Sequence, residues 1–337
     1  MKAGIAALQS SRWPTSTLRG RRSHRAVVRD RVGRIIDDTG FLKQGKHSVG
    51  VQRQYTGSAG KTTNCQVAVS LTVATSTAHL PIDFDLYLPT CWTEDAKRRS
   101  EGRIPAEISF RTKPQIALDM ISRAVQGGVP KGIVLADAGY GNGSEFRAGV
   151  RALGLEYGVA IQGTNLLWRL GQNEQIVGDA ISAQDLARQL TEEDFRRCTW
   201  RDGTGGGLSA RFAAYRVASA HKDALVDRSD REAIWILIEW RDGEAEPTHF
   251  HLCSLPQSTT RKQMVRLIKE RYRTERAYEE LKGEFGLDHF EGRRYSGWHH
   301  HVSVVLCCFA FAAAEIARRF PPSAADETIV DSVTAAA

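Results

Sequence analysis

The stretch Gly132-Ile-Val-Leu-Ala-Asp137-Ala-Gly-Tyr-Gly-Asn-Gly143 decides the fold class. Its apolar first half predicts a buried strand that ends at Asp137. Helical spacing of apolar residues over Lys113–Gln126 precedes this strand, and Ser144 can cap a further helix that runs to about Leu153. Alternating helices and strands are typical of an α/β sheet, in which ligands bind beside the strand ends.

More strands are predicted on both sides of this stretch. Ile35-Ile36 leads into Asp37-Asp38-Thr39-Gly40, which indicates an apolar strand that ends in acids and a turn. The segments with strand-like composition are Cys65–Ala74, Leu80–Leu88 and Tyr157–Ile161.

The pattern changes between residues 165 and 258, where we expect a mostly β insertion. A glycine-rich turn after Trp200 and a second turn at Asp242-Gly243 separate segments of strand-like composition. These segments are Arg211–Val217, Ala233–Trp240 and Thr248–Leu252. Helical patterns return over Lys262–Glu284 and Gly297–Arg319.

Charge is distributed unevenly along the 337 residues. Residues 1–34 carry nine Lys or Arg and one Asp, whereas the whole chain has a net charge of +7. The rest of the chain is therefore close to neutral, and its overall charge does not argue for a nucleic-acid partner. We expect residues 1–33 to form a disordered basic arm and residues 321–337 a disordered tail.

Cysteine usage and hydropathy indicate a cytoplasmic protein with no membrane partner. The six cysteines form no C-x-x-C pair, and Cys307-Cys308 lies in an apolar run where both are expected in the core. The N-terminus lacks the apolar segment of a signal peptide. The longest apolar stretch, Val302–Ala314, is too short to span a bilayer.

Three acidic positions are candidates for a metal site. Asp38, or its neighbour Asp37, follows the first strand, Asp137 follows a later one, and Glu275 lies on the predicted helix after the insertion. Carboxylates at strand ends are costly unless they are paired or bind metal. Three convergent carboxylates suit Mg²⁺ or Mn²⁺, and two such ions can drive phosphodiester hydrolysis. Taken singly, each acid is better explained as a turn or capping residue.

The helix that carries Glu275 also carries cations. At about 100° per residue, Arg271, Glu275 and Lys282 lie within about 40° of one another. Such a face could hold DNA phosphates beside a metal ligand, or it could be a solvated stripe of ion pairs. Glu279 lies about 40° from Glu275 and is its nearest rival, whereas Glu280 lies about 140° away and should face solvent.

The chain resembles the DDE transposases of bacterial insertion sequences, and most closely the insertion-sequence seven-oh-one group. Arg271, Glu275 and Lys282 match the R-x3-E-x6-K part of the Y-R-E-K signature, although the Tyr position holds Ile268. The resemblance extends from about Arg34 to Phe320. The other stretches that carry it are Asp37–Lys46, Ser48–Gly57, Leu86–Pro89, Ala136–Gly141 and Glu279–Arg293.

The resemblance implies an RNase H-like mixed sheet flanked by helices, with a β insertion before the last catalytic residue. It implies that Asp38, chosen because it directly precedes Thr39, acts with Asp137 and Glu275 to bind two Mg²⁺ or Mn²⁺ ions. Arg271 and Lys282 would contact DNA. The implied activity is nicking of transposon ends followed by strand transfer into target DNA, by a homodimer when bound to DNA.

The implied domains are a first catalytic part over residues 34–164, the insertion over residues 165–258, and a helical completion over residues 259–320. Family members usually carry a helical DNA-binding region ahead of the first Asp, which we expect to be missing here. Two alternatives follow: an inactive remnant that only binds DNA, or a stand-alone RNase H-like metal nuclease.

Other signals have simpler explanations. Gly139-x-Gly141-x-Gly143 departs from the dinucleotide-binding pattern and favours a turn beside a metal ligand. Consecutive helical residues point about 100° apart, so His299-His300-His301 cannot face one metal ion together. Trp168 and Trp200 could stack on a flipped DNA base or belong to the core of the insertion.

Overall fold

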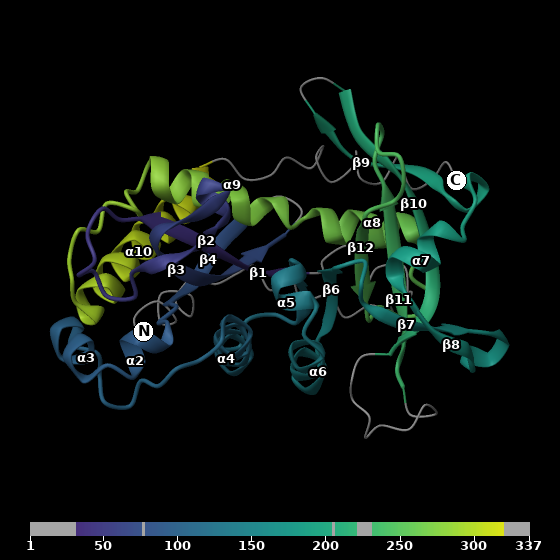
Figure 1. Cartoon of the computed structure of the whole chain (residues 1–337). Coiled ribbons are helices and arrows are strands. Elements are labelled where there is room, and N and C mark those ends of the chain that lie inside the picture. Colours follow the sequence, from purple (N-terminus) through teal and green to yellow (C-terminus); the bar gives the residue numbers. More distant parts are fainter. Residues whose placement is uncertain (1–31, 76–77, 204–205, 221–230, 320–337) are drawn as a thin grey trace. The chain divides into compact units, whose positions relative to one another are not determined.

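The computed structural model describes residues 32–75, 78–203, 206–220 and 231–319, which form two compact units (Figure 1). Within this range the first unit comprises Asp38–Phe110 and the chain from Arg273, and the second comprises residues 32–37 and Arg111–Tyr272. The predicted arm, over residues 1–33, lies outside the described residues except for its last two, and the predicted tail lies outside them entirely.

The sheet of the first unit is built from the start of the chain. Its strands are β1 (Val32–Leu42), β2 (Gln52–Thr56), β3 (Lys61–Ala74) and β4 (His79–Leu86), in the order β2-β3-β1 with β4 also paired to β3. β2 and β4 are both antiparallel to β3. A short 3-10 turn over Gly57–Ala59 joins β2 to β3.

The helices of the first unit are α2 (Thr90–Thr93), α3 (Ala96–Gly102), α10 (Tyr295–Arg319) and all but the first residue of α9 (Tyr272–Gly283). Figure 1 shows α9 and α10 on one face of the β2-β3-β4 strands. Contacts of Tyr278 with Ser70 and Phe84 and of Phe309 with His79 agree with this arrangement.

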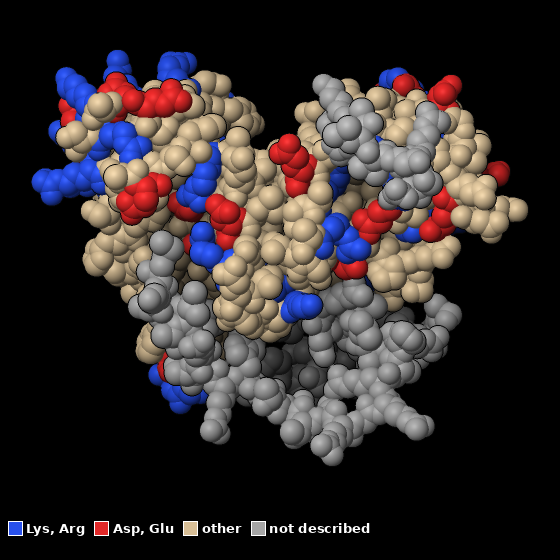
Figure 2. All heavy atoms as spheres, turned by 90° about the horizontal axis from the view of Figure 1, so that it is seen from below, with Lys and Arg blue, Asp and Glu red and all other residues tan. Residues whose placement is uncertain are grey.

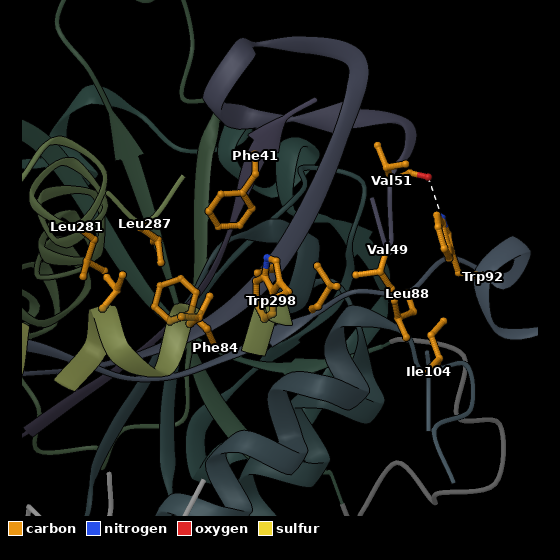
Figure 3. Packing of buried hydrophobic residues seen from close by; sticks show 14 of the residues in the cluster. Phe41, Val49, Val51, Phe84, Leu88, Trp92, Ile104, Leu281, Leu287 and Trp298 are labelled. Carbon is orange, nitrogen blue, oxygen red and sulfur yellow. Dashed lines mark hydrogen bonds between the residues drawn. The ribbon is translucent and has the colours of Figure 1, made fainter. Parts of the chain in front are cut away.

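One apolar cluster forms the core of the first unit, and Figure 3 shows its packing. Trp298 of α10 is 1% exposed and makes an edge contact with Phe41 of β1 at 6.2 Å between ring centroids. Trp92 of α2 is equally buried, and its indole Nε1 donates to the Val51 carbonyl at 2.8 Å. Burial of such large aromatic side chains anchors both helices to the sheet.

The second unit continues from β1 into a long mixed sheet. β1, β5 (Gly132–Ala136) and β6 (Glu156–Ile161) are parallel, with Ile35 opposite Leu135 and Val134 opposite Tyr157. The sheet then continues in the order β6-β12-β11-β10-β7-β8, with β9 paired to β10. These strands are β7 (Leu166–Leu170), β8 (Ile176–Ser182), β9 (Arg196–Gly203), β10 (Gly206–Ser219), β11 (Ala233–Trp240) and β12 (His249–Cys253).

Helices cover the strands of the second unit. They are α4 (Lys113–Gln126), α5 (Ala138–Gly141), α6 (Ser144–Ala152), α7 (Ala183–Arg188) and α8 (Arg261–Lys269), with 3-10 turns over Gln172–Glu174 and Glu192–Asp194. A capping box between Thr112 and Gln115 starts α4. α4 and α6 lie side by side in Figure 1, and Gly149 of α6 lies close to the Leu118 side chain.

The mixed α/β class and the β-rich insertion are confirmed. Antiparallel strands followed by parallel ones, with β1 common to both strand orders, form an RNase H-like mixed sheet flanked by helices. β12 pairs directly with β6, so strands of the insertion extend the sheet that contains β5.

Three sequence-based expectations about elements are wrong. β1 continues through Asp37-Asp38 and Thr39-Gly40 to Leu42, so the acids lie inside the strand. The helix expected over Lys262–Glu284 is two helices, separated at Glu270-Arg271. Cys307-Cys308 lies on an exposed side of α10, because the side that faces the sheet carries Val302, Val305 and Phe309 instead.

α10 is longer than its central apolar stretch. Among the described residues, it is the one helix whose length and apolar composition would allow it to cross a membrane. Core helices can share both properties. Trp298, Val302, Val305 and Phe309 of α10 are buried in the core of the first unit, which accounts for part of its apolar character.

Candidate active site

Asp137 occupies a tightly built turn at the end of β5. Residues Ile133–Ala136 are buried, and Asp137 follows as the half-buried N-cap of α5, where its Oδ1 accepts from the Gly139 amide at 2.9 Å. A Cβ atom at Gly141 would lie 2.0 Å from the Ala160 carbonyl oxygen, so only glycine fits there. The glycines after Asp137 thus build a turn, as the sequence favours.

Buried polar side chains hold this turn from other elements. Arg147 of α6 is 4% exposed and donates to the Gly141 carbonyl and, at 3.1 Å, to Ser219 Oγ on β10. Asn142 Oδ1 accepts from the Gln162 amide and from Asn165 Nδ2, both at 2.8 Å. The sequence alone did not single out Arg147 or Asn142, because the contacts with Ser219, Gln162 and Asn165 join separate segments of the chain.

Two cations contact the side of β1 that carries Asp37, Thr39 and Phe41. Asp37 Oδ2 pairs with Arg271 at 2.5 Å, and Thr39 Oγ1 accepts from Lys282 Nζ at 2.8 Å. The Lys282 ammonium also lies 5.3 Å from the centre of the Phe41 ring. Side chains alternate along a strand, so Asp38 points to the opposite side of β1 from Asp37 and its alternate neighbours.

Strand register relates Asp37 to Asp137. Ile35 and Leu135 are register partners in the parallel pair β1–β5, so their side chains share one side of the sheet. Asp37 and Asp137 each follow two residues later, and Asp137 keeps an extended backbone with ψ −177°. Alternation therefore puts these two acids on the same side, which favours Asp37 over Asp38 as the neighbour of Asp137.

Glu275 and Lys282 share a face of α9, about 20° apart. Glu275 is exposed, whereas Lys282 is half-buried and donates to the Gly40 carbonyl at 3.0 Å as well as to Thr39. Burial lowers the pKa of Lys282, an effect that Asp288 partly opposes. Arg271 precedes α9, so its nearness to β1 comes from the break between the helices and not from a helical face.

The other acids of α9 have partners on the surface. Glu279 has a side chain that is 69% exposed and lies 3.5 Å from Arg276. Glu280, which was expected to face solvent, is half-buried instead and pairs with His79 of β4 at 3.1 Å. Glu275 and Glu279 are thus the two acids of α9 that a ligand in solvent can reach most directly.

The three candidate metal ligands are divided between the units. Asp38 and Glu275 belong to the first unit and Asp137 to the second. Within each unit, the described residues contain no group of three or more His, Cys, Asp and Glu that could hold a metal ion. All three are carboxylates, and none of the three is buried, so the donor chemistry fits a hard divalent ion.

The histidine run and the two tryptophans have ordinary partners. His301 donates to the Gly286 carbonyl at 3.1 Å, while the ring of His299 packs against Tyr295 and Trp298. Trp200 makes an edge contact with Phe212. Trp168 lies 5.5 Å from the Arg231 guanidinium, which places both tryptophans in cation–π or aromatic contacts of the insertion.

Surface charge adds no single basic field on the face drawn in Figure 2. Blue and red side chains lie next to each other there, separated by neutral residues. This distribution agrees with a main body that is close to neutral. Recognition of a polyanion on this face would therefore rest on particular cations and not on overall charge.

Comparison with known proteins identifies the family. The profile of the family described as "DDE superfamily endonuclease" matches residues 5–207, and that of the "Transposase DDE domain" matches residues 110–311. The chain belongs to the DDE transposase family. The first range contains Asp38 and Asp137 of this DDE chain, and the second contains Asp137 and Glu275.

Similar proteins include the "Probable transposase for insertion sequence element IS701" of Microchaete diplosiphon. It is 36% identical over 129 residues, which are 38% of this DDE chain and 31% of that relative. The match thus spans less than a third of the relative's length. A solved structure, "Cryo-EM structure of piggyBac transposase synaptic complex with hairpin DNA", aligns with a TM-score of 0.36 at 8% identity over 82% of this chain and 45% of that one.

Proposed function

We propose that the chain is a transposase that nicks DNA at the ends of an insertion sequence and transfers the freed strand into target DNA. The observation that carries this proposal is the match of two DDE profiles over ranges that contain Asp38, Asp137 and Glu275. The rigid turn that presents Asp137 supports it, because a phosphoryl-transfer site needs ligands held in fixed positions. The protein acts in the cytoplasm, as a homodimer on DNA.

In this proposal Asp137, Glu275 and a first acid from β1 hold divalent ions, two Mg²⁺ or alternatively Mn²⁺. The first acid is Asp38 by the family's Asp-Thr pattern or Asp37 by the strand register. Bound there, such ions supply Lewis-acid activation of a water and neutralisation of charge on the leaving oxygen. The chain's own contribution is positioning. The Gly139 amide fixes one oxygen of Asp137, and Arg147 fixes the turn behind it.

Arg271 and Lys282 are proposed to contact the phosphates beside the scissile bond. Lys282 is suited to this role because oxygens of Thr39, Gly40 and Ser58 fix the position of its ammonium group, whose positive charge would attract a phosphate. A cation fixed in this way loses little conformational entropy when it binds a phosphate. Arg271 already binds one carboxylate and keeps about a third of its side chain exposed.

Asp37 competes with Asp38 for the position of the first acid. The family's Asp-Thr pattern selects Asp38, whereas the strand register and the Arg271 contact support Asp37. The two acids point to opposite sides of β1, so one substitution should affect catalysis far more than the other.

The test is Mg²⁺-dependent nicking of a supercoiled plasmid that carries the genomic DNA from both sides of the coding sequence. Asp137→Ala should reduce nicking to background while the unfolding midpoint stays within a few degrees of wild type, because loss of a metal ligand disables the reaction. Of Asp37→Asn and Asp38→Asn, one should match this loss and the other should keep most activity, because the two side chains point to opposite sides of β1. The variant that loses activity identifies the first acid. Full nicking by Asp137→Ala would refute the proposal, and strand-transfer products separate a transposase from a simple nuclease.

A further inference from the structure

Two residues, Glu270 and Arg271, separate α8 from α9, and the β insertion holds the residues on both sides of this break. On the α8 side, Lys269 Nζ donates to Glu239 Oε1 of β11 at 2.7 Å. Glu239 is only 1% exposed and also accepts from Arg241 at 3.1 Å. The last residue of α8 is thus fixed to a buried carboxylate of the insertion.

Aromatic contacts fix the break further. The Lys269 ammonium lies 4.3 Å from the centre of the Trp200 ring on β9. On the α9 side, the Arg201 guanidinium stacks at 3.8 Å from the centre of the Tyr272 ring. β9 therefore contacts the chain on both sides of the break through cation–π contacts, and β11 contacts it before the break through an ion pair.

Arg271 lies between the two gripped residues and contacts a different part of the sheet. Its guanidinium pairs with Asp37 of β1 at 2.5 Å. Arg271 lies between Lys269 and Tyr272, so contacts that fix these two residues also fix the position of Arg271. Because Tyr272 is the first residue of α9, its contacts also fix where α9 starts. Glu275 lies in the first turn of α9, three residues after Tyr272.

We propose that Glu239 and Lys269 are positioning residues, through which the β insertion sets the start of α9 and thereby the placement of Arg271 and Glu275. The proposal rests on the proposed function for its catalytic consequence. A buried ion pair is a poor source of stability, since an apolar pair of similar volume is often as stable. What the Glu239–Lys269 ion pair provides is a fixed distance and direction between the two side chains. At this break, α9 needs a fixed starting position to place Glu275.

The main test separates geometry from stability with the double variant Glu239→Leu/Lys269→Met. Apolar replacement of both partners should leave the unfolding midpoint close to wild type, with Arg241 turning to solvent. The nicking rate at saturating DNA and Mg²⁺ should fall about 100-fold, as expected for a small misplacement of catalytic groups. The DNA concentration for half-maximal rate should rise by less than tenfold, because Arg271 is the displaced group that is proposed to contact DNA. Lys269→Arg keeps the ion pair and should stay within about tenfold of wild type.

The control is Glu174→Leu/Arg216→Met, which removes another ion pair of the insertion, 2.7 Å long, that involves no residue of α8 or α9. It should nick at the wild-type rate. Wild-type nicking by Glu239→Leu/Lys269→Met, or an equal loss in the control, would overturn the inference. If the double variant does not fold, Glu239→Gln provides the same rate comparison.

Hydrogen exchange provides a readout that does not depend on activity. Amides of Glu270, Arg271 and Tyr272 should exchange at least tenfold faster in the double variant than in wild type and in the control. Unchanged exchange would overturn the positioning role. If wild-type protein fails to nick DNA but exchange at the break responds as expected, the proposed function fails while the link between insertion and α9 stands.

Discussion

At the scale of single residues, the acids of α9 provide the sharpest comparison. Glu275→Gln keeps the shape of the side chain but removes the anionic oxygen that a hard divalent ion needs. We expect nicking in Mg²⁺ to fall to background while binding to end DNA is kept or strengthened, since one repulsion with phosphate is lost. Glu279→Gln, also exposed, is the matched control and should keep most activity. The reverse result would mean that the motif is aligned to the wrong acid.

Sequence patterns found single residues only where the deciding contacts are local. The place of Asp137 at the end of a strand was recognisable because an apolar run precedes it and glycines follow it. The pairing of Asp37 with Arg271 joins residues on distant parts of the chain. No periodicity within either segment reveals such a contact, and the same is true of Arg147 behind the Asp137 turn.

At the scale of elements, the Asp137 turn depends on a close approach between α5 and β6. Gly141→Ala should lower the free energy of unfolding by about 3 kcal/mol, because the new methyl group would meet the Ala160 backbone and force the turn to move. Nicking should fall with it. Chemical denaturation measures the first effect, and Gly57→Ala, with open space around its Cβ, is the control. A stability equal to wild type would contradict the packing described for this turn.

The elements themselves were predictable to different degrees. The bounds of α4, β5 and β11 agree with the sequence patterns, because each has clear caps, glycines or a continuous apolar run. The extent of β1 and the break at Glu270-Arg271 could not be predicted, since acids usually interrupt strands and residues 262–284 keep a helical composition throughout. Both features carry contacts between distant parts of the chain: Asp37 and Thr39 of β1 bind Arg271 and Lys282, and Lys269 before the break binds Glu239.

At the scale of the whole molecule, the long sheet of the second unit holds a half-buried histidine, His251, whose enclosed ring nitrogen should make folding sensitive to acid. Burial lowers the pKa of His251 to about 3, with Glu239 opposing and Lys269, His249 and Arg271 adding to the effect. The unfolded chain, with a pKa near 6.5, therefore binds the proton first as the pH falls. Stability should decrease from about pH 6.5 toward about pH 3.

The size of this effect follows from the linkage between proton binding and folding. Between pH 7 and pH 5, His251 should account for about 2 kcal/mol of lost stability. His251→Gln should remove that part of the pH dependence in denaturation experiments, whereas His300→Gln, on the exposed side of α10, should leave it intact. An identical pH dependence in wild type and His251→Gln would show that the imidazole does not control it.

The pairing of β12 with β6 makes the β insertion a continuation of the catalytic sheet, so the insertion is not a module that can be removed. A shortened protein in which residues 165–258 are replaced by a linker would expose the backbone of β6 as a free edge, with Val159 and Ile161 beside it. Exposed apolar edges recruit strands from other chains and lead to aggregation. A minimal catalytic core of this protein must therefore keep β12, and recombination that exchanges whole insertions between relatives has to preserve the pairing of this strand with its neighbour.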